Sequence, residues 1–356
     1  DHELPWYGIV ASAEALFTKN NDALWFDRVD VGAPTAVGQD GRLIYWNDAG
    51  RNPANAGRFG IEHGGAVSNR ANKPSDVNQA IVVRNNSEGS AQQFTLSLSK
   101  PMVDNWSWTV GYTYTHATDF SPATSSQNSS NWNNTLVFQT NQPEAYNSRY
   151  AIKDRFTGVL TWQKAFFGDN KTSVSMFYEG RSGRPFSYIF YNDVNGDSAT
   201  TNDLFYVPNG YGDVLFTGGA PMEQAFFDWL NQNPELKSYQ GGVAPANAFR
   251  ASWVNSFDVR ISQEFPGFMD GHKAEVSLDI MNFGNLLNKD WGHINDYGFF
   301  ATRRVANYAG IDPATGKYVY NFTGSTDNES LQEVNNDGVN TAVSRWSVML
   351  GLRYRF

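Results

Sequence analysis

The chain has 356 residues, no cysteine and a formal net charge of −9 at pH 7. The absence of cysteine excludes disulfide bridges and thiolate metal sites, and the acidic balance without a basic block argues against a nucleic-acid partner. Aromatic residues make up 15% of the chain although its mean hydropathy is −0.49. No segment approaches the roughly 18 apolar residues of a membrane-spanning helix. Strands that meet a membrane on one face explain this composition better than a large soluble core does.

Apolar and polar residues alternate in nine segments. In WSWTVGYTYT, residues 106–115, every second residue is apolar and its neighbours are Ser, Thr or Gly. Such a period of two is typical of a strand with one apolar face. Only ALWFDRVDV, residues 23–31, has an ambiguous phase. The nine predicted strands lie near residues 6–19, 22–32, 79–99, 106–118, 150–165, 171–184, 252–264, 272–286 and 342–356.

The connections between these segments alternate between short and long. The short ones are 20–21, 101–105, 168–170 and 266–271, and the long ones are about 33–77, 119–149, 184–251 and 287–341. Compact soluble domains rarely hold such long loops, whereas outer-membrane barrels join tight periplasmic turns with long extracellular loops. The sequence therefore predicts an all-β fold, an antiparallel transmembrane β-barrel with long extracellular loops and a periplasmic C-terminus.

The predicted number of strands is odd. Bacterial single-chain barrels have even numbers of strands, and an unpaired strand edge in hydrocarbon is costly. We therefore expect residues 1–356 to form the C-terminal portion of a larger barrel, as an open curved sheet unless other polypeptide completes the wall. The alternative is a complete small barrel with a tenth strand, most plausibly within residues 33–77.

One long connection carries a pattern of oxygen ligands. In YNDVNGDSATTNDLFYVP, residues 191–208, Asp193, Asn195 and Asp197 occupy alternate positions and Asp203 follows. Ca²⁺ prefers six to eight oxygen ligands, so these four residues are a candidate calcium site. The glycine stands at the fourth position rather than the sixth, and no Glu closes the loop at the twelfth. The alternative is a loop held by Asx turns.

The same connection contains a predicted amphipathic helix at residues 221–231. Its apolar residues are Met222, Ala225, Phe226, Trp229 and Leu230. We expect this face to pack against neighbouring loops rather than to bind a ligand.

Catalytic motifs are weak. HGG at residues 63–65 resembles an oxyanion-hole element but has no nucleophile elbow to serve, and the five histidines show no paired metal spacing. Charges at Asp258, Arg260, Glu275 and Asp279 are expected to form an ion-pair ladder on the lumen side of the wall. The sequence therefore does not indicate an enzyme.

Four segments together resemble a known family. They are DVNGDSATTNDLFYVP at residues 193–208, GGVAPANAFRASWVNSFDVRISQEFPGF at 241–268, KAEVSLDIMNFGNLLNKDWG at 273–292 and LGLRYRF at 350–356. They resemble the C-terminal barrel of TonB-dependent receptors of the Oar-like type. The resemblance is most specific over residues 171–356.

The resemblance implies a location and partners. Barrels of this family have 22 strands, contain an N-terminal plug and engage the TonB complex, so this chain would supply about nine strands of the outer-membrane wall of a Gram-negative bacterium. Plug and TonB box are not in this sequence. The terminal strand resembles the signal that the outer-membrane insertion machinery reads, through Leu350, Leu352, Tyr354 and Phe356.

The expected function is the uptake of a scarce solute. The long loops would capture the ligand, and the aromatic residues predicted to face it are Trp132, Tyr191, Phe205 and Tyr206. Two alternatives remain. One is a complete porin or adhesin, and the other is a surface protein whose loops dock a protein partner, with the helix at 221–231 as anchor.

Overall fold

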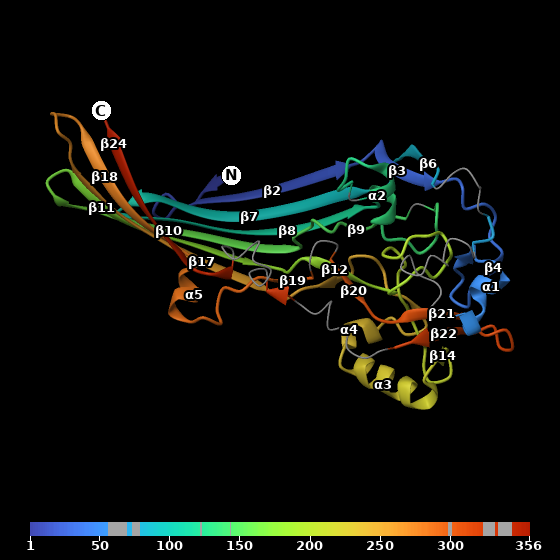
Figure 1. Ribbon diagram of the computed structural model, residues 1–356. Coiled ribbons are helices and arrows are strands. Elements are labelled where there is room, and N and C mark those ends of the chain that lie inside the picture. The colour runs from blue at the N-terminus through green and yellow to red at the C-terminus, as the bar shows by residue number, and fades with distance from the viewer. Residues whose placement is uncertain are drawn as a thin grey trace.

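The computed structural model describes residues 1–55, 70–72, 79–121, 123–142, 144–297, 301–322, 332–333 and 344–356. Its largest element is a curved antiparallel sheet of long strands, which we call the wall (Figure 1). The wall strands are β2 (Val10–Lys19), β7 (Ser90–Val103), β8 (Trp106–Asp119), β10 (Asp154–Phe167), β11 (Asn170–Arg181), β17 (Val254–Pro266), β18 (Lys273–Met281) and β24 (Ser347–Arg355). The short strands β1 (His2–Glu3) and β9 (Tyr146–Asn147) pair with β2 and β8.

The predicted all-β fold is confirmed at the level of a large antiparallel sheet. Each long strand pairs with the next long strand along the chain, in the order β2-β7-β8-β10-β11-β17-β18-β24. In the described part of the chain, no helix is long and apolar enough to cross a membrane.

The second predicted strand is not part of the wall. Residues 22–32 form β3 (Ala23–Arg28), which pairs with β6 (Ile81–Asn86) in a separate two-stranded sheet. Lys19 of β2 pairs with Ser90 of β7, and Ala23 of β3 pairs with Asn86 of β6. The second pair lies four residues after Lys19 on one strand and four residues before Ser90 on the other. The register is therefore unbroken, and residues 20–21 do not reverse the chain. The expected turn at 20–21 is wrong, because this pair of strands simply continues beyond the wall.

The ambiguous phase of residues 23–31 has a structural cause. Trp25 and Phe26 are consecutive in β3 and both are buried. Burial on both faces is incompatible with the alternation of a half-exposed strand. The predicted strand at 79–99 divides accordingly into β6 and β7, with an interruption around Gly89.

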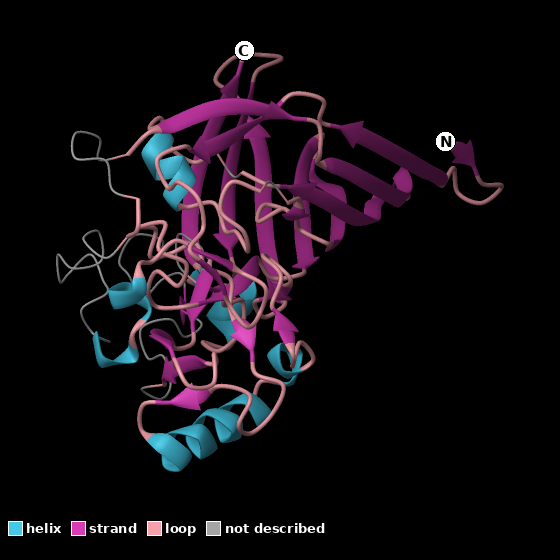
Figure 2. Cartoon of the chain, turned by 90° about the vertical axis from the view of Figure 1, so that its right-hand side faces the viewer, coloured by secondary structure: helices cyan, strands magenta, loops and turns pink. Residues whose placement is uncertain are grey.

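The corrected wall has eight long strands among the described residues rather than nine. β2 begins, and β24 ends, at the end of the sheet that carries the short turns between wall strands. Among the described residues no pairing joins β24 to β1 or β2, so the sheet that they form is open (Figure 2). The expectation of an open curved sheet is confirmed, but the odd number from which it was argued is wrong.

The long connections pack together at the other end of the wall, and we call this structure the cap (Figure 1). The short helix α5 (Phe283–Leu287) lies beside β17. Besides β3 and β6 the cap contains α1 (Asp48–Arg51), the 3-10 helix η1 (Pro53–Asn55), α2 (Asn128–Asn133), α3 (Gly219–Asn231) and α4 (Pro234–Lys237). Its other strands are β4 (Ala36–Val37), β5 (Leu43–Ile44), β12 (Pro185–Ile189), β13 (Tyr206–Val207), β14 (Leu215–Phe216), β15 (Gly242–Val243), β16 (Phe249–Arg250), β19 (Asn295–Asp296), β20 (Thr302–Arg304), β21 (Asn307–Ile311), β22 (Tyr318–Asn321) and β23 (Gln332–Glu333).

The cap has its own hydrophobic core. Trp46 comes from the first long connection, Phe205 from the third and Tyr320 from the fourth, and all three belong to one buried cluster. The predicted helix is α3, and its Phe226 and Leu230 are buried in that same cluster. The expectation that its apolar face packs on neighbouring loops is therefore confirmed.

Substitutions on the two faces of β3 test whether this strand packs into the cap. Trp25 is buried against Phe120 at a ring-centroid distance of 5.7 Å, whereas the adjacent Leu24 is exposed. Trp25→Ala should destabilise the cap by about 3–5 kcal/mol because it leaves a cavity, and Leu24→Ala should cost less than about 1 kcal/mol. Hydrogen exchange of the β3 and β6 amides measures both. Equal effects would contradict the assignment of β3 to the cap.

Candidate functional site

One face of the wall is a continuous apolar band of exposed and half-buried side chains. Because paired residues of neighbouring strands lie on the same face, the band can be followed by register. One such row crosses six strands: Leu350, Leu278, Ile261, Val174, Trp162 and Trp106. Leu350 is 75% exposed and Leu96 is 61% exposed. Soluble monomers rarely expose apolar patches larger than a few hundred Å².

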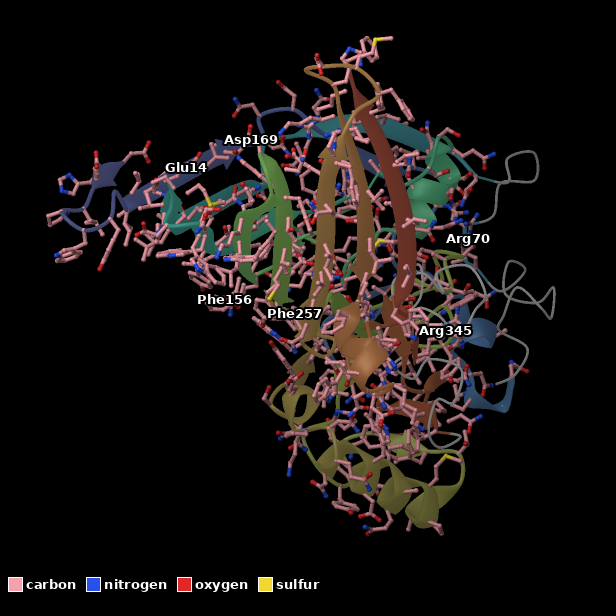
Figure 3. The ribbon with its side chains drawn as sticks, turned by 90° about the vertical axis from the view of Figure 1, so that its left-hand side faces the viewer. Glu14, Arg70, Phe156, Asp169, Phe257 and Arg345 are labelled. Carbon is pink, nitrogen blue, oxygen red and sulfur yellow. The ribbon has the colours of Figure 1, made fainter. Side chains whose placement is uncertain are left out.

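Aromatic side chains mark both ends of this band. Near the short turns the rings of Trp106 and Trp162 lie 6.3 Å apart, and near the cap those of Phe156 and Trp253 lie 6.2 Å apart. From Phe156 to Phe166, β10 extends roughly 33 Å along the strand. If the strand is tilted by about 40° from the barrel axis, this length spans about 25 Å along that axis. This is the height of the apolar band of outer-membrane barrels. Phe156 and Phe257 both lie at the cap end of the sheet, away from Asp169 in a short turn (Figure 3).

The opposite face of the wall is polar. Arg260 contacts Glu275 at 3.2 Å and Asp279 at 3.1 Å, and Arg355 contacts Glu275 at 3.1 Å. The predicted ion-pair ladder is therefore present. Asp258 takes a different role, because it accepts a hydrogen bond of 2.7 Å from the backbone N–H of Asn282.

The residues of the predicted assembly signal lie on the last strand. Leu350, Leu352 and Tyr354 are on the apolar face of β24, and Phe356 follows it directly. Leu352 is 80% exposed. Their recognition by an insertion machinery stays a prediction.

The cap is held by a buried polar network around two aspartates of different connections. Arg28 contacts Asp30 at 2.9 Å, and Arg70 contacts the same carboxylate at 3.1 Å. Arg42 contacts Asp203 at 2.6 Å and Asp40 at 3.3 Å, with its side chain fully buried. The first long connection is thereby joined to the third.

The predicted calcium ligands lie inside this network. Asp193 accepts hydrogen bonds of 2.6 Å from the N–H groups of Gly196 and Ser198. Asp197 accepts from Ala199 N–H at 2.9 Å and from Thr140 at 2.5 Å. Asp203 accepts from the N–H of Val194 at 2.9 Å as well as from Arg42.

This arrangement is the Asx-turn loop of the alternative prediction. Every carboxylate oxygen of the three aspartates accepts a hydrogen bond from the protein, and Asn195 Oδ1 accepts one from Asp197 N–H. Within the described ranges no group of three or more His, Cys, Asp or Glu side chains is placed to hold a metal ion. A cation would have to share these oxygens with their present donors. Calcium binding stays a prediction.

The network carries an excess of negative charge. Three arginines face five aspartates, which gives a formal charge of −2 when all eight are ionised. These residues are Arg28, Arg42, Arg70, Asp30, Asp40, Asp193, Asp197 and Asp203. Either bound protons or a divalent cation would neutralise the excess.

The pKa values of Asp193 and Asp203 reflect this excess. Burial, with the charges of Asp197 and Asp203, holds the pKa of Asp193 well above its usual range. Burial also raises the pKa of Asp203 to about 7, against the lowering effect of Arg42. In a low-dielectric interior, neighbouring carboxylates favour the retention of protons.

Three of the four aromatic residues predicted to face a ligand are core residues of the cap. Phe205 is fully buried, and Trp132 and Tyr206 are also buried. The guanidinium of Arg28 lies 5.0 Å from the ring centroid of Trp132. These three rings pack inside the cap rather than at its surface, and their contact with a ligand stays a prediction. Tyr191 is only partly buried, and its role stays a prediction. HGG at 63–65 lies outside the described residues.

The arginines of the network were not predicted from the sequence. Arg42 and Asp203 are 161 residues apart, and Arg28 donates to the Asp197 carbonyl across 169 residues. No local pattern distinguishes them from surface arginines. Comparisons with protein-family models, curated proteins and solved structures found no match.

The raised pKa of Asp203 predicts how the stability of the cap depends on pH. The folded cap retains a proton that the unfolded chain releases at its ordinary pKa of 3.8. The contribution of this group is therefore complete below about pH 4 and is lost as the pH rises through about 7. Thermal unfolding of the cap should occur at higher temperature at pH 5 than at pH 8, and Asp203→Asn should reduce the difference. An unchanged difference in that variant would contradict the assignment.

Calcium supplies a second test of the same charge excess. At pH 8, adding Ca²⁺ should raise the unfolding temperature of the native cap, because a divalent cation replaces the lost protons. The double variant Asp193→Asn and Asp197→Asn should not respond, while a variant at the exposed Asp48 serves as control. If calcium has no effect on the native chain, the loop is an ordinary Asx-turn structure.

Proposed function

We propose that this chain is the C-terminal portion of the β-barrel of a TonB-dependent outer-membrane receptor of the Oar-like type. The observation that carries the proposal is the apolar band, which crosses all eight wall strands on one face while the other face bears ion pairs. A surface that is apolar outside and charged inside matches a wall between lipid and an aqueous or protein-filled lumen.

The open edges of the wall favour a section of a larger barrel. Among the described residues, β2 is paired on its outer edge only at Val10 and Ala11, and β24 only with β18. Backbone groups without partners cost several kcal/mol each in hydrocarbon. The remaining strands of the barrel, with the plug, would supply the missing partners.

The functional role follows from the family resemblance. In this proposal the cap is extracellular and captures a scarce solute, and the plug then rearranges through TonB and the proton gradient. The wall is passive. The short turns and the C-terminus face the periplasm, and the terminal strand is the segment read by the insertion machinery.

A complete small outer-membrane protein is the second candidate. The even number of long strands favours it, because the wall begins and ends at the same side. Closure would then require β2 to pair with β24. A disulfide formed between cysteines introduced at Ala13 and Leu350, on those two edges, would support this candidate over the first.

The band supplies the test of the membrane location. Leu350 and Met349 are adjacent in β24, both exposed, and on opposite faces. Leu350→Arg should cost about 2–4 kcal/mol if it lies near the middle of the bilayer, while Met349→Arg can pair with Asp279 opposite it and should cost much less.

Outer-membrane abundance and heat-modifiable gel mobility of the full-length protein measure both variants. Met349 is a better control than Gly351, since a Cβ at Gly351 would lie 2.6 Å from Ser277 Oγ. Equal loss in the two variants would contradict a lipid-facing band.

A further inference from the structure

A cavity of about 600 Å³ lies where β17 begins and β18 ends, at the cap end of the apolar band. Its volume falls within the range of small-molecule sites. Six residues that give it its chemical character are Trp253, Asn255, Phe257, Phe283, Asp290 and Trp291. Phe257 pairs with Tyr178 on the face of the wall that carries the band, and α5 lies beside β17 (Figure 1).

The loop that forms one side of this cavity is rigidly held by amide side chains. Asn282 takes a left-handed conformation with φ of 51°, and its Nδ2 donates to the carbonyl of Gly292 at 2.9 Å. Asn285 Nδ2 donates to the carbonyls of Lys289 and Trp291, each at 2.9 Å. These bonds close residues 282–292 into a ring. A preformed loop lowers the entropy cost of binding.

Gly292 is required for this closure. A Cβ atom at Gly292 would lie 1.9 Å from Asn282 Oδ1, and the φ of 68° is one that residues with a side chain rarely adopt. The loop therefore places Trp291 directly before a position that favours glycine. Trp291 is 56% exposed despite this fixed position.

The cavity combines aromatic surface with polar atoms that have no side-chain hydrogen bond among the described residues. Asn255 Oδ1 accepts from Tyr178 at 2.9 Å and from Trp253 Nε1 at 3.2 Å, which fixes the orientation of the amide. Its NH₂ group and the Asp290 carboxylate make no side-chain hydrogen bond within the described residues. One donor and one acceptor thus stand among exposed rings.

We propose that this cavity binds a sugar ring. A pyranose has apolar C–H faces that pack on aromatic rings and hydroxyl groups that both donate and accept, which matches Trp291, Asn255 and Asp290. Asp290 is exposed, and its carboxylate can accept hydrogen bonds from the hydroxyl groups of such a ring. The ring belongs either to a soluble saccharide or to the headgroup of a glycolipid. The glycolipid source rests on the proposed membrane location, because the cavity lies at the border of the band.

Titration of the full-length protein in phospholipid nanodiscs tests the proposal. The probes are lipopolysaccharide and the oligosaccharide released from it by mild acid. Isothermal titration calorimetry measures the binding of each probe. Trp291→Ala and Asp290→Ala should each weaken binding about tenfold or more, because they remove the stacking surface and the acceptor. Trp106→Ala is the matched control, since it removes an exposed tryptophan at the other end of the band.

The possible results distinguish a soluble saccharide from a glycolipid, and they test the sugar site separately from the membrane location. Binding of the free oligosaccharide that is lost in the cavity variants supports a soluble ligand, and binding of lipopolysaccharide alone with the same loss supports a glycolipid. No binding, equal binding by variants and control, or displacement by choline would overturn the sugar site. Heat-modifiable mobility, measured on the same samples, reports separately whether the wall inserts in a membrane.

Discussion

Side-chain alternation along eight paired strands is the constraint on which this structure depends. In a sheet a shift of one residue moves every side chain to the opposite face. Here such a shift in β18 would bring Glu275 and Asp279 into the apolar band and Leu278 among the charges of the other face. The segregation of apolar and charged residues therefore fixes the register of each strand relative to its neighbours, and the ion pairs of Arg260 and Arg355 join adjacent strands in that register.

The cap is stabilised by different physics. Its connections lack the regular ladder of the wall, so packing and buried polar bonds must bring together segments distant in sequence. Trp46, Phe205 and Tyr320 supply a shared aromatic core, and Arg42 joins Asp40 to Asp203 beside it. Removal of one partner from such a buried pair is costly because the remaining charge is left without compensation. The long connections therefore form one packed cap at the end of the wall rather than a set of independent loops.

Local patterns predicted the wall well and the cap poorly. Alternation revealed the faces of β8 and β24, because successive side chains of a strand point to opposite faces and these two faces differ in polarity. It failed at β3, because burial on both faces removes the alternation. The turn predicted at residues 20–21 was also wrong, because the pairing of β2 with β7 continues in the pairing of β3 with β6. The helix α3 was predictable from its period, and the carboxylates of Asp193 and Asp197 from their spacing. Their partners were not, because Thr140 is brought to the carboxylate of Asp197, and Arg28 to its backbone carbonyl, only by the tertiary fold.

The central claim is that one face of the wall meets lipid. Because the chain has no native cysteine, single cysteines can be introduced at successive positions from Gln93 to Leu98 in β7 and spin-labelled in protein reconstituted into phospholipid bilayers. Collision with oxygen, which concentrates in the bilayer, should be high at positions 94, 96 and 98, and collision with a water-soluble nickel complex should follow the opposite phase. Equal accessibility to both reagents at all six positions would contradict the account.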